Sequence, residues 1–262
     1  MPPPGWSAVF EVGDSSLVAP AFLFVHSLLL GPLTWAPVAT RLASLGMVTA
    51  IPSLVGVTVL EEPPFWPRVV GKVKEAVEQL PPGEPILIVA HSNAGLFVPV
   101  IAHAVRPPVA GCLFVDATLP ARTGASPATT PERLHQLRSM ATDGRLPRWT
   151  TWWPEDEVAR LFPDPQTRSA VTAEQPRLPL SYYEQKIPVP AGWDDRPCGY
   201  LLFGPPYHHL AQEARERGWD VEQVPGEHLH QLVDPDAVAQ RIAAMARTWL
   251  DRTPRADGRS CR

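Results

Sequence analysis

The apolar residues of this chain gather in short unbroken runs, separated by longer stretches in which apolar residues recur at helical intervals. The runs lie at residues 21–25, 47–51, 86–90, 109–116 and 198–203. A short apolar run without polar alternation is typical of a strand buried on both faces, as in a parallel sheet. A further short strand is predicted at residues 219–224, and a loose alternation over residues 6–18 predicts an edge strand.

Helical spacing fills the intervals between these runs. The predicted helices cover residues 33–45, 66–80, 94–105, 207–217 and 235–250. Gly46 and the prolines after Leu80 end the first two, and Asp234 followed by Pro235 is an N-cap signal that begins the last. Strands that alternate with helices predict an α/β fold, a doubly wound and mostly parallel sheet with right-handed crossovers.

The alternation stops between Thr118 and Asp195, where prolines and charges surround two short helical pieces at residues 131–140 and 154–162. An insertion of this length is either a disordered linker or a lid over a binding site, and its seven aromatic residues argue against disorder. Each aromatic residue taken singly is better explained as an anchor of the lid than as a substrate contact. We therefore expect a core at residues 1–117 and 196–251, a lid at 118–195 and a flexible tail at 252–262.

The chain is organised around an apolar strand that leads into a serine. The strand at residues 86–90 leads into His91, Ser92 and Asn93, and the small residues Ala94 and Gly95 come next. A sharp turn there exposes the Ser92 hydroxyl, and the helix that follows points its N–H groups at any negative charge that develops nearby. The simpler interpretation is a polar turn, because Ser and Asn are common in turns and at N-caps.

This strand–turn–helix segment resembles the nucleophile elbow of the α/β-hydrolase family, written G-x-S-x-G, although Ala90 and Ala94 replace both glycines. The resemblance implies a chain order of Ser92, then an acid, then a histidine after the last strand. His228 stands in that place, two residues after Gly226. His230 is the rival, but it belongs to the segment expected to pack against the core.

The acid is not where this family most often has it. After the strand at residues 198–203 the sequence reads Gly204-Pro-Pro-Tyr207, without a carboxylate. The other position used in the family is the end of the strand after the nucleophile's strand, and Asp116 stands there. The resemblance implies that Asp116 orients His228. The competing interpretation is that Asp116 caps the first turn of the lid.

An acyl-transfer site also needs two donors for the oxyanion that forms at the carbonyl. The resemblance assigns one donor to the backbone N–H of Asn93 and the other to the backbone N–H of Leu28. Leu28 lies in a turn where the family often has His-Gly, whereas this chain has His26-Ser27. His91 and His26 are interpreted as neighbours of the turns rather than as second bases. The candidate substrate contacts are His26, Ser27, Trp153 and Tyr183.

The composition of the chain argues against several classes of binding partner and cofactor. The net charge is −4 with no basic block, which argues against nucleic acid and anionic membranes as partners. Three widely spaced cysteines argue against a disulfide framework and a zinc site, and no spacing suggests another metal or a cofactor. The N-terminus lacks a cationic segment followed by an apolar one, so a cytoplasmic protein is expected.

The resemblance implies a serine hydrolase that cleaves an ester or thioester through an acyl-enzyme. The acyl group is expected to be small to medium and bulky or aromatic, on a substrate that is free or attached to a carrier. An acyltransferase with the same three residues, a lyase or cyclase on the same scaffold, and a non-catalytic binding protein remain alternatives. Sequence alone does not separate hydrolysis from transfer, and it does not indicate the oligomeric state.

Overall fold

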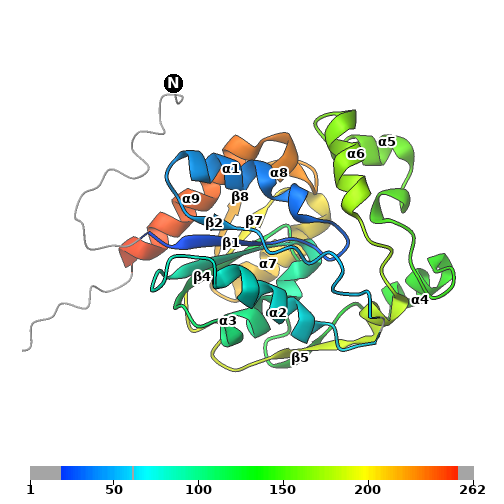
Figure 1. The fold of residues 1–262 in the computed structure, drawn as a ribbon, viewed down its shortest axis with the longest axis horizontal. Coiled ribbons are helices and arrows are strands. Elements are labelled where there is room, and N and C mark those ends of the chain that lie inside the picture. Colours follow the sequence, from blue (N-terminus) through cyan, green and yellow to red (C-terminus); the bar gives the residue numbers. More distant parts are fainter. Residues whose placement is uncertain (1–18, 61, 253–262) are drawn as a thin grey trace, which may run out of the picture.

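Six parallel strands form the central sheet of the computed structural model, which describes residues 19–60 and 62–252. Their order across the sheet is β2-β1-β3-β4-β7-β8 (Figure 1). The strands are β1 Ala21–Val25, β2 Thr49–Ala50, β3 Ile86–His91, β4 Val109–Val115, β7 Cys198–Leu202 and β8 Asp220–Gln223. The prediction of a doubly wound, mostly parallel sheet is confirmed.

Helices cover both faces of the sheet, and alternate strand residues face each layer. Phe22 and Phe24 of β1 pack in one apolar cluster, whereas Leu23 and Val25 pack in the other. On the first side lie α1 (Ala36–Ser44) and α9 (Pro235–Arg252), and on the second lie α2 (Trp66–Val77), α3 (Val98–Ala104) and α7 (His208–Glu216). The inner strands β1, β3, β4 and β7 are therefore buried on both faces, as their unbroken apolar runs predict, whereas the edge strands β2 and β8 are partly exposed.

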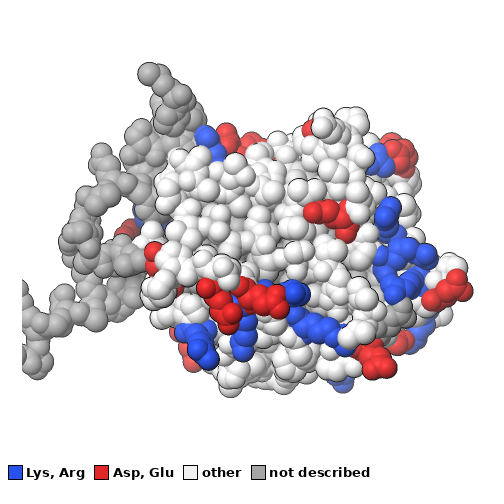
Figure 2. All heavy atoms as spheres, viewed as in Figure 1, with Lys and Arg blue, Asp and Glu red and all other residues white. Residues whose placement is uncertain are grey.

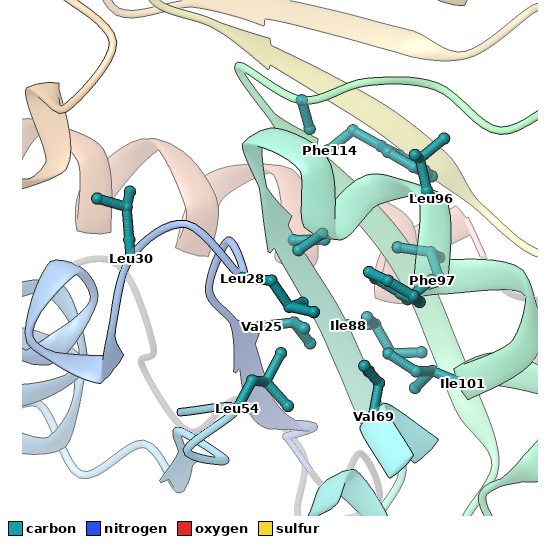
Figure 3. Packing of buried hydrophobic residues seen from close by; sticks show 14 of the residues in the cluster. Val25, Leu28, Leu30, Leu54, Val69, Ile88, Leu96, Phe97, Ile101 and Phe114 are labelled. Carbon is teal, nitrogen blue, oxygen red and sulfur yellow. The ribbon is translucent and has the colours of Figure 1, made fainter. Parts of the chain in front are cut away.

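The turn that follows β1 packs its apolar side chains in the core. Leu28 is 2% exposed and packs in the same cluster as Val25 and Leu54, which Figure 3 shows near it. The side chain of Phe97 lies in this cluster too. This packing fixes the backbone of residue 28 at the carboxyl end of β1, close to the end of β3.

Two predicted elements differ in detail. The predicted helix at residues 94–105 begins as a 3₁₀ helix, η2 (Ser92–Phe97), and becomes the α-helix α3 where Pro99 stands in the first turn. The predicted helix at 33–45 is likewise divided into η1 (Pro32–Thr34) and α1. Proline is accepted in a first helical turn because its missing N–H would have no partner there. The edge strand predicted at residues 6–18 lies outside the described residues.

The insertion at residues 118–195 has more regular structure than its sequence predicts. The predicted helical pieces are present as α4 (Pro131–Met140) and α5 (Glu155–Ala159). The unpredicted elements are α6 (Pro165–Glu174), the antiparallel pair β5 (Gly124–Pro127) and β6 (Lys186–Val189), and the 3₁₀ turns η3 (Trp149–Thr151) and η4 (Leu180–Glu184). The Asp164 carboxylate accepts a hydrogen bond from Thr167 N and caps α6, so the Asp-Pro signal that marks α9 is present here as well.

Aromatic side chains attach this insertion to the core. Tyr182 is fully buried, and its ring lies 6.1 Å from that of Phe65 and 6.5 Å from that of Phe97. Gln185 adds a polar contact, since its side-chain oxygen accepts a hydrogen bond from Phe65 N at 2.9 Å. In Figure 1 the helices α5 and α6 stand together at one side of the sheet, and α4 lies on the same side, apart from them.

The surface carries both signs of charge. On the face in Figure 2, acidic and basic side chains are interspersed around a broad neutral area. None of the helices in the described part of the chain is long and apolar enough to cross a membrane.

Substitution of Gly95 tests how closely η2 approaches the segment that follows β4. A Cβ at residue 95 would overlap the carbonyl oxygen of Thr118 and lie 3.1 Å from the Phe114 ring. We expect Gly95→Ala to lower the free energy of unfolding by about 1–3 kcal/mol, as overpacking does. Gly71 in α2 has open space around it, so Gly71→Ala should raise the stability by about 0.5–1 kcal/mol through helix propensity. Urea unfolding measures both, and equal effects would contradict the close approach.

Candidate active site

Ser92 lies at the sharp turn between β3 and η2. Its backbone has φ of 58°, in the left-handed region that a non-glycine residue seldom adopts. The Ser92 carbonyl accepts a hydrogen bond from Thr118 N at 3.0 Å, which helps to hold this conformation. Such strain persists where the surroundings impose it, and it is common at functional turns. The geometry matches the elbow that the sequence resembles.

Asp116 and His228 meet although 112 residues separate them. His228 Nδ1 lies 2.8 Å from Asp116 Oδ2, and Phe203 N donates to Asp116 Oδ1 at 2.9 Å. Asp116 is 1% exposed, so these two hydrogen bonds satisfy a carboxylate that would otherwise be costly to bury. Because a carboxylate only accepts, Nδ1 carries the proton and Nε2 presents its lone pair.

His230, the rival histidine, lies in another environment. Its ring is 5.7 Å from that of Phe203 in an edge contact, and it lies so close to Gly226 that any side chain at residue 226 would overlap it. His230 opens the short helix α8 (His230–Val233). Only His228 of the two contacts Asp116 among the described residues.

Tyr207 is a site residue that the sequence did not single out. It ends the 3₁₀ turn η5 (Pro205–Tyr207), just after β7, and its ring is parallel to that of His228 with centroids 4.8 Å apart. Its hydroxyl lies 3.5 Å from His228 Nε2. Parallel rings at this distance stack with an offset, so the hydroxyl lies in a plane above the imidazole and not in the plane of the Nε2 lone pair. The lone pair therefore stays available to a proton donor in that plane.

The Tyr207 hydroxyl also contacts the serine. Burial and the neighbouring charge of Asp116 raise the pKa of Tyr207, while its hydrogen bond with Ser92 acts in the opposite direction. Tyr207 thus joins the hydroxyl of Ser92 to the ring of His228. Tyr207 follows the strand after which the family most often has its acid, and this position is the sequence feature that could have identified it as a site residue.

Two buried histidines support these turns. His91 donates from Nε2 to the carbonyl oxygen of His228 at 2.9 Å, and burial followed by the proximity of His228 lowers its pKa well below the usual value. His26 donates from Nδ1 to Ser27 O and accepts at Nε2 from Leu54 N at 2.9 Å. Both nitrogens of His26 are occupied by backbone, so this side chain holds the turn after β1 and has none left for a substrate.

Leu28 and Asn93, whose backbone N–H groups are the predicted oxyanion donors, are joined through the side chain of Asn93. Leu28 N donates to Asn93 Oδ1 at 3.1 Å, and Ser27 Oγ donates to the same oxygen at 2.9 Å. The turn after β1 is therefore joined to the residue that follows Ser92. In the described residues, no group of three or more His, Cys, Asp or Glu side chains is placed to hold a metal ion.

Comparison with protein-family models matches residues 22–241 to the alpha/beta hydrolase family. The chain belongs to the alpha/beta hydrolase family. No curated protein matches it significantly.

Solved structures share this alpha/beta hydrolase fold at low sequence identity. An extracellular alpha/beta-hydrolase from a Paenibacillus species, described as homologous in structure and function to Tobacco Salicylic Acid Binding Protein 2, is 17% identical, with 87% of this chain and 99% of that chain covered and a TM-score of 0.67. A pyrethroid hydrolase from Sphingobium faniae JZ-2 is 18% identical, with coverage of 88% and 98% and a TM-score of 0.66. A variant of tomato Methylketone Synthase I in complex with beta-ketoheptanoate is 13% identical, with coverage of 90% and 100% and a TM-score of 0.69.

The insertion brings aromatic residues to this alpha/beta hydrolase site. The ring of Trp149 lies 6.0 Å from that of His228, and Trp153 lies 5.0 Å beyond Trp149. Trp153 is 39% exposed, whereas Tyr183 is buried against Tyr182. Of these aromatic residues, Trp149 has its ring nearest to that of His228 among the contacts described. The sequence analysis did not single it out as a candidate site residue.

Trp153 also lines a cavity of about 710 Å³. Its lining comes from η3, α5 and α6, and includes Arg148, Arg168 and Thr172. Neither Ser92 nor His228 lines it, so this cavity belongs to the insertion and not to the site at Ser92.

His26 gives a test of this site's pH dependence. Burial lowers its pKa from 6.5 to about 4. As the pH falls, the unfolded chain takes a proton first, so stability that is complete above pH 6.5 is lost between 6.5 and 4, by about 2–3 kcal/mol at pH 4.5. We expect His26→Gln to show a smaller loss between pH 7 and 4.5 in urea unfolding. An unchanged difference would mean that His26 contributes nothing to it.

Proposed function

We propose that this chain is a serine hydrolase that cleaves an ester or thioester through an acyl-enzyme. The observation that carries the proposal is the Asp116–His228 hydrogen bond of 2.8 Å beside the strained Ser92 turn. A serine hydroxyl is a poor nucleophile until a neighbouring base accepts its proton. His228 Nε2 is the only nitrogen of that ring left to do so.

The reaction proceeds in two halves. Ser92 Oγ attacks the carbonyl carbon while His228 accepts the hydroxyl proton, and the carbonyl oxygen becomes an oxyanion. When the tetrahedral intermediate collapses, the imidazolium returns the proton to the departing alcohol or thiol. Water then attacks the acyl-enzyme with His228 as base, which releases the carboxylic acid and restores Ser92.

Asp116 has an orienting role in this scheme. It fixes the tautomer of His228 and stabilises the imidazolium that forms in each half-reaction. The rings of Tyr207 and Trp149 pack against the imidazole of His228. An aromatic face next to an imidazolium is energetically favourable. Tyr207 is therefore a positioning residue for His228.

The acyl group is expected to be bulky or aromatic. Trp149 and the partly exposed Trp153 form an apolar wall that leads away from His228. Aromatic walls of this kind bind apolar groups by area and by ring contacts. Acyl transfer to an alcohol or amine uses the same three residues, so product analysis with and without an added acceptor separates transfer from hydrolysis.

Labelling with a fluorophosphonate tests the nucleophile. We expect stoichiometric modification of Ser92, none in Ser92→Ala, and labelling slower by about 10²-fold or more in His228→Ala, because the base is lost. His230→Ala is the matched control and should label at a rate close to that of the wild type. Mass spectrometry of the intact protein and of its peptides measures both. An unlabelled wild-type protein, or equal losses in the two histidine variants, would contradict the assignment.

Asp116→Asn tests the orienting role separately from the nucleophile. The amide keeps the shape of the side chain but presents a donor or a weaker acceptor to His228, so the imidazole takes the wrong tautomer. We expect a loss of about 10³–10⁴-fold in kcat for an ester substrate, with a circular dichroism spectrum like that of the wild type. Nearly full activity in a folded variant would assign the acid elsewhere.

A further inference from the structure

The side chain of Asn93 occupies the place where an oxyanion donor was expected to be free. Its Oδ1 accepts one hydrogen bond from Leu28 N at 3.1 Å and another from Ser27 Oγ at 2.9 Å. Ser27 Oγ itself accepts from Leu29 N at 3.2 Å, which directs its own proton toward Asn93. The backbone N–H of Leu28 is thus already bound to oxygen within the chain.

These contacts fix the orientation of the carboxamide. A backbone N–H only donates, so the atom facing Leu28 must be the oxygen, and the amide group cannot be exchanged end for end. The Asn93 Nδ2 group is then the other end of the same planar group. It is buried and has no hydrogen-bond partner among the described residues.

A buried donor without a partner is costly, and it requires an explanation. The group stands on the residue directly after Ser92, beside the turn that was expected to form the oxyanion hole. An oxyanion is the acceptor that would satisfy such a donor, and it is present only during the reaction. A donor fixed in advance favours the transition state over the free protein.

We propose that Asn93 Nδ2 donates a hydrogen bond to the oxyanion, and that Leu28 N–H and Ser27 Oγ act through Asn93 Oδ1 to hold it in place. This inference rests on the proposed acyl-enzyme chemistry. Asn93 is then a catalytic residue by its side chain as well as by its backbone N–H. Leu28 and Ser27 are positioning residues. The orientation of the Asn93 carboxamide is set before the reaction, because Leu28 packs in the core and its N–H is held rigidly.

The proposal also accounts for a departure from the family pattern. Ser27 stands where the resemblance leads one to expect glycine, and glycine has no hydroxyl to hold Asn93. The two residues lie 66 positions apart in the sequence and are joined by this hydrogen bond. A serine at 27 and an asparagine at 93 therefore form one functional unit.

The competing arrangement makes opposite predictions. If Leu28 N–H itself binds the oxyanion, then the Asn93 carboxamide blocks it and must rotate away. Removing the side chain would then open the site. Under the proposal, removing it deletes a donor.

The decisive comparison is wild type against Asn93→Ala, with an aryl ester for steady-state kinetics and a fluorophosphonate for labelling of Ser92. We expect kcat to fall by about 10²-fold with KM nearly unchanged, and the labelling rate to fall by a similar factor. Thermal unfolding of the variant checks that it is folded. A kcat/KM equal to or above that of the wild type would overturn the proposal and assign the donor to Leu28.

Ser27→Gly is the second variant and restores the residue typical of the family. It removes one of the two bonds on Asn93 Oδ1, so we expect kcat to fall by about tenfold because the donor is less well held. A rise in activity would show that Asn93 had been blocking the site and would also overturn the proposal. If the wild type neither hydrolyses esters nor reacts with the fluorophosphonate, the proposed function itself fails, and the role of Asn93 fails with it.

Discussion

A single hydrogen bond between a buried carboxylate and an imidazole joins the end of β4 to the loop that carries His228. The carboxylate of Asp116 is almost fully buried, and only Phe203 N and His228 Nδ1 hydrogen-bond to it among the described residues. The cost of burying such a charge is several kcal/mol when its partner is removed. Folding and site assembly are therefore coupled, because the loop that carries His228 must close before Asp116 is satisfied.

The parallel sheet provides the first of these contacts. β4 and β7 are paired up to Val115 and Leu201, and Asp116 N continues the ladder by donating to Leu201 O at 2.9 Å. Beyond that bond, Asp116 has a φ of 43°, and its side chain turns to Phe203 N. The sheet register thus determines where the carboxylate lies, as expected of an α/β sheet whose strands end at the functional site.

The core and the turn at Ser92 were predictable from the sequence because their signals are contiguous. Unbroken apolar runs indicated the strands of the sheet, and small residues around Ser92 indicated the elbow. The pair β5–β6 was not predictable, since its residues carry no alternation and pair with partners about 60 positions away. Tyr207 and Trp149 were missed for a similar reason: their importance comes from three loops that meet at one imidazole ring.

The departures from the family pattern show which positions are physically constrained. Ala90 and Ala94 replace glycines and are fully buried, whereas at Gly95 a Cβ would overlap the carbonyl oxygen of Thr118. Position 95 is therefore one at which the backbone leaves no room for a side chain. Ser27 is different, since its hydroxyl adds a contact that glycine cannot make. Under the role proposed for Asn93, this added hydrogen bond moves the oxyanion donor from the backbone of Leu28 to the side chain of Asn93.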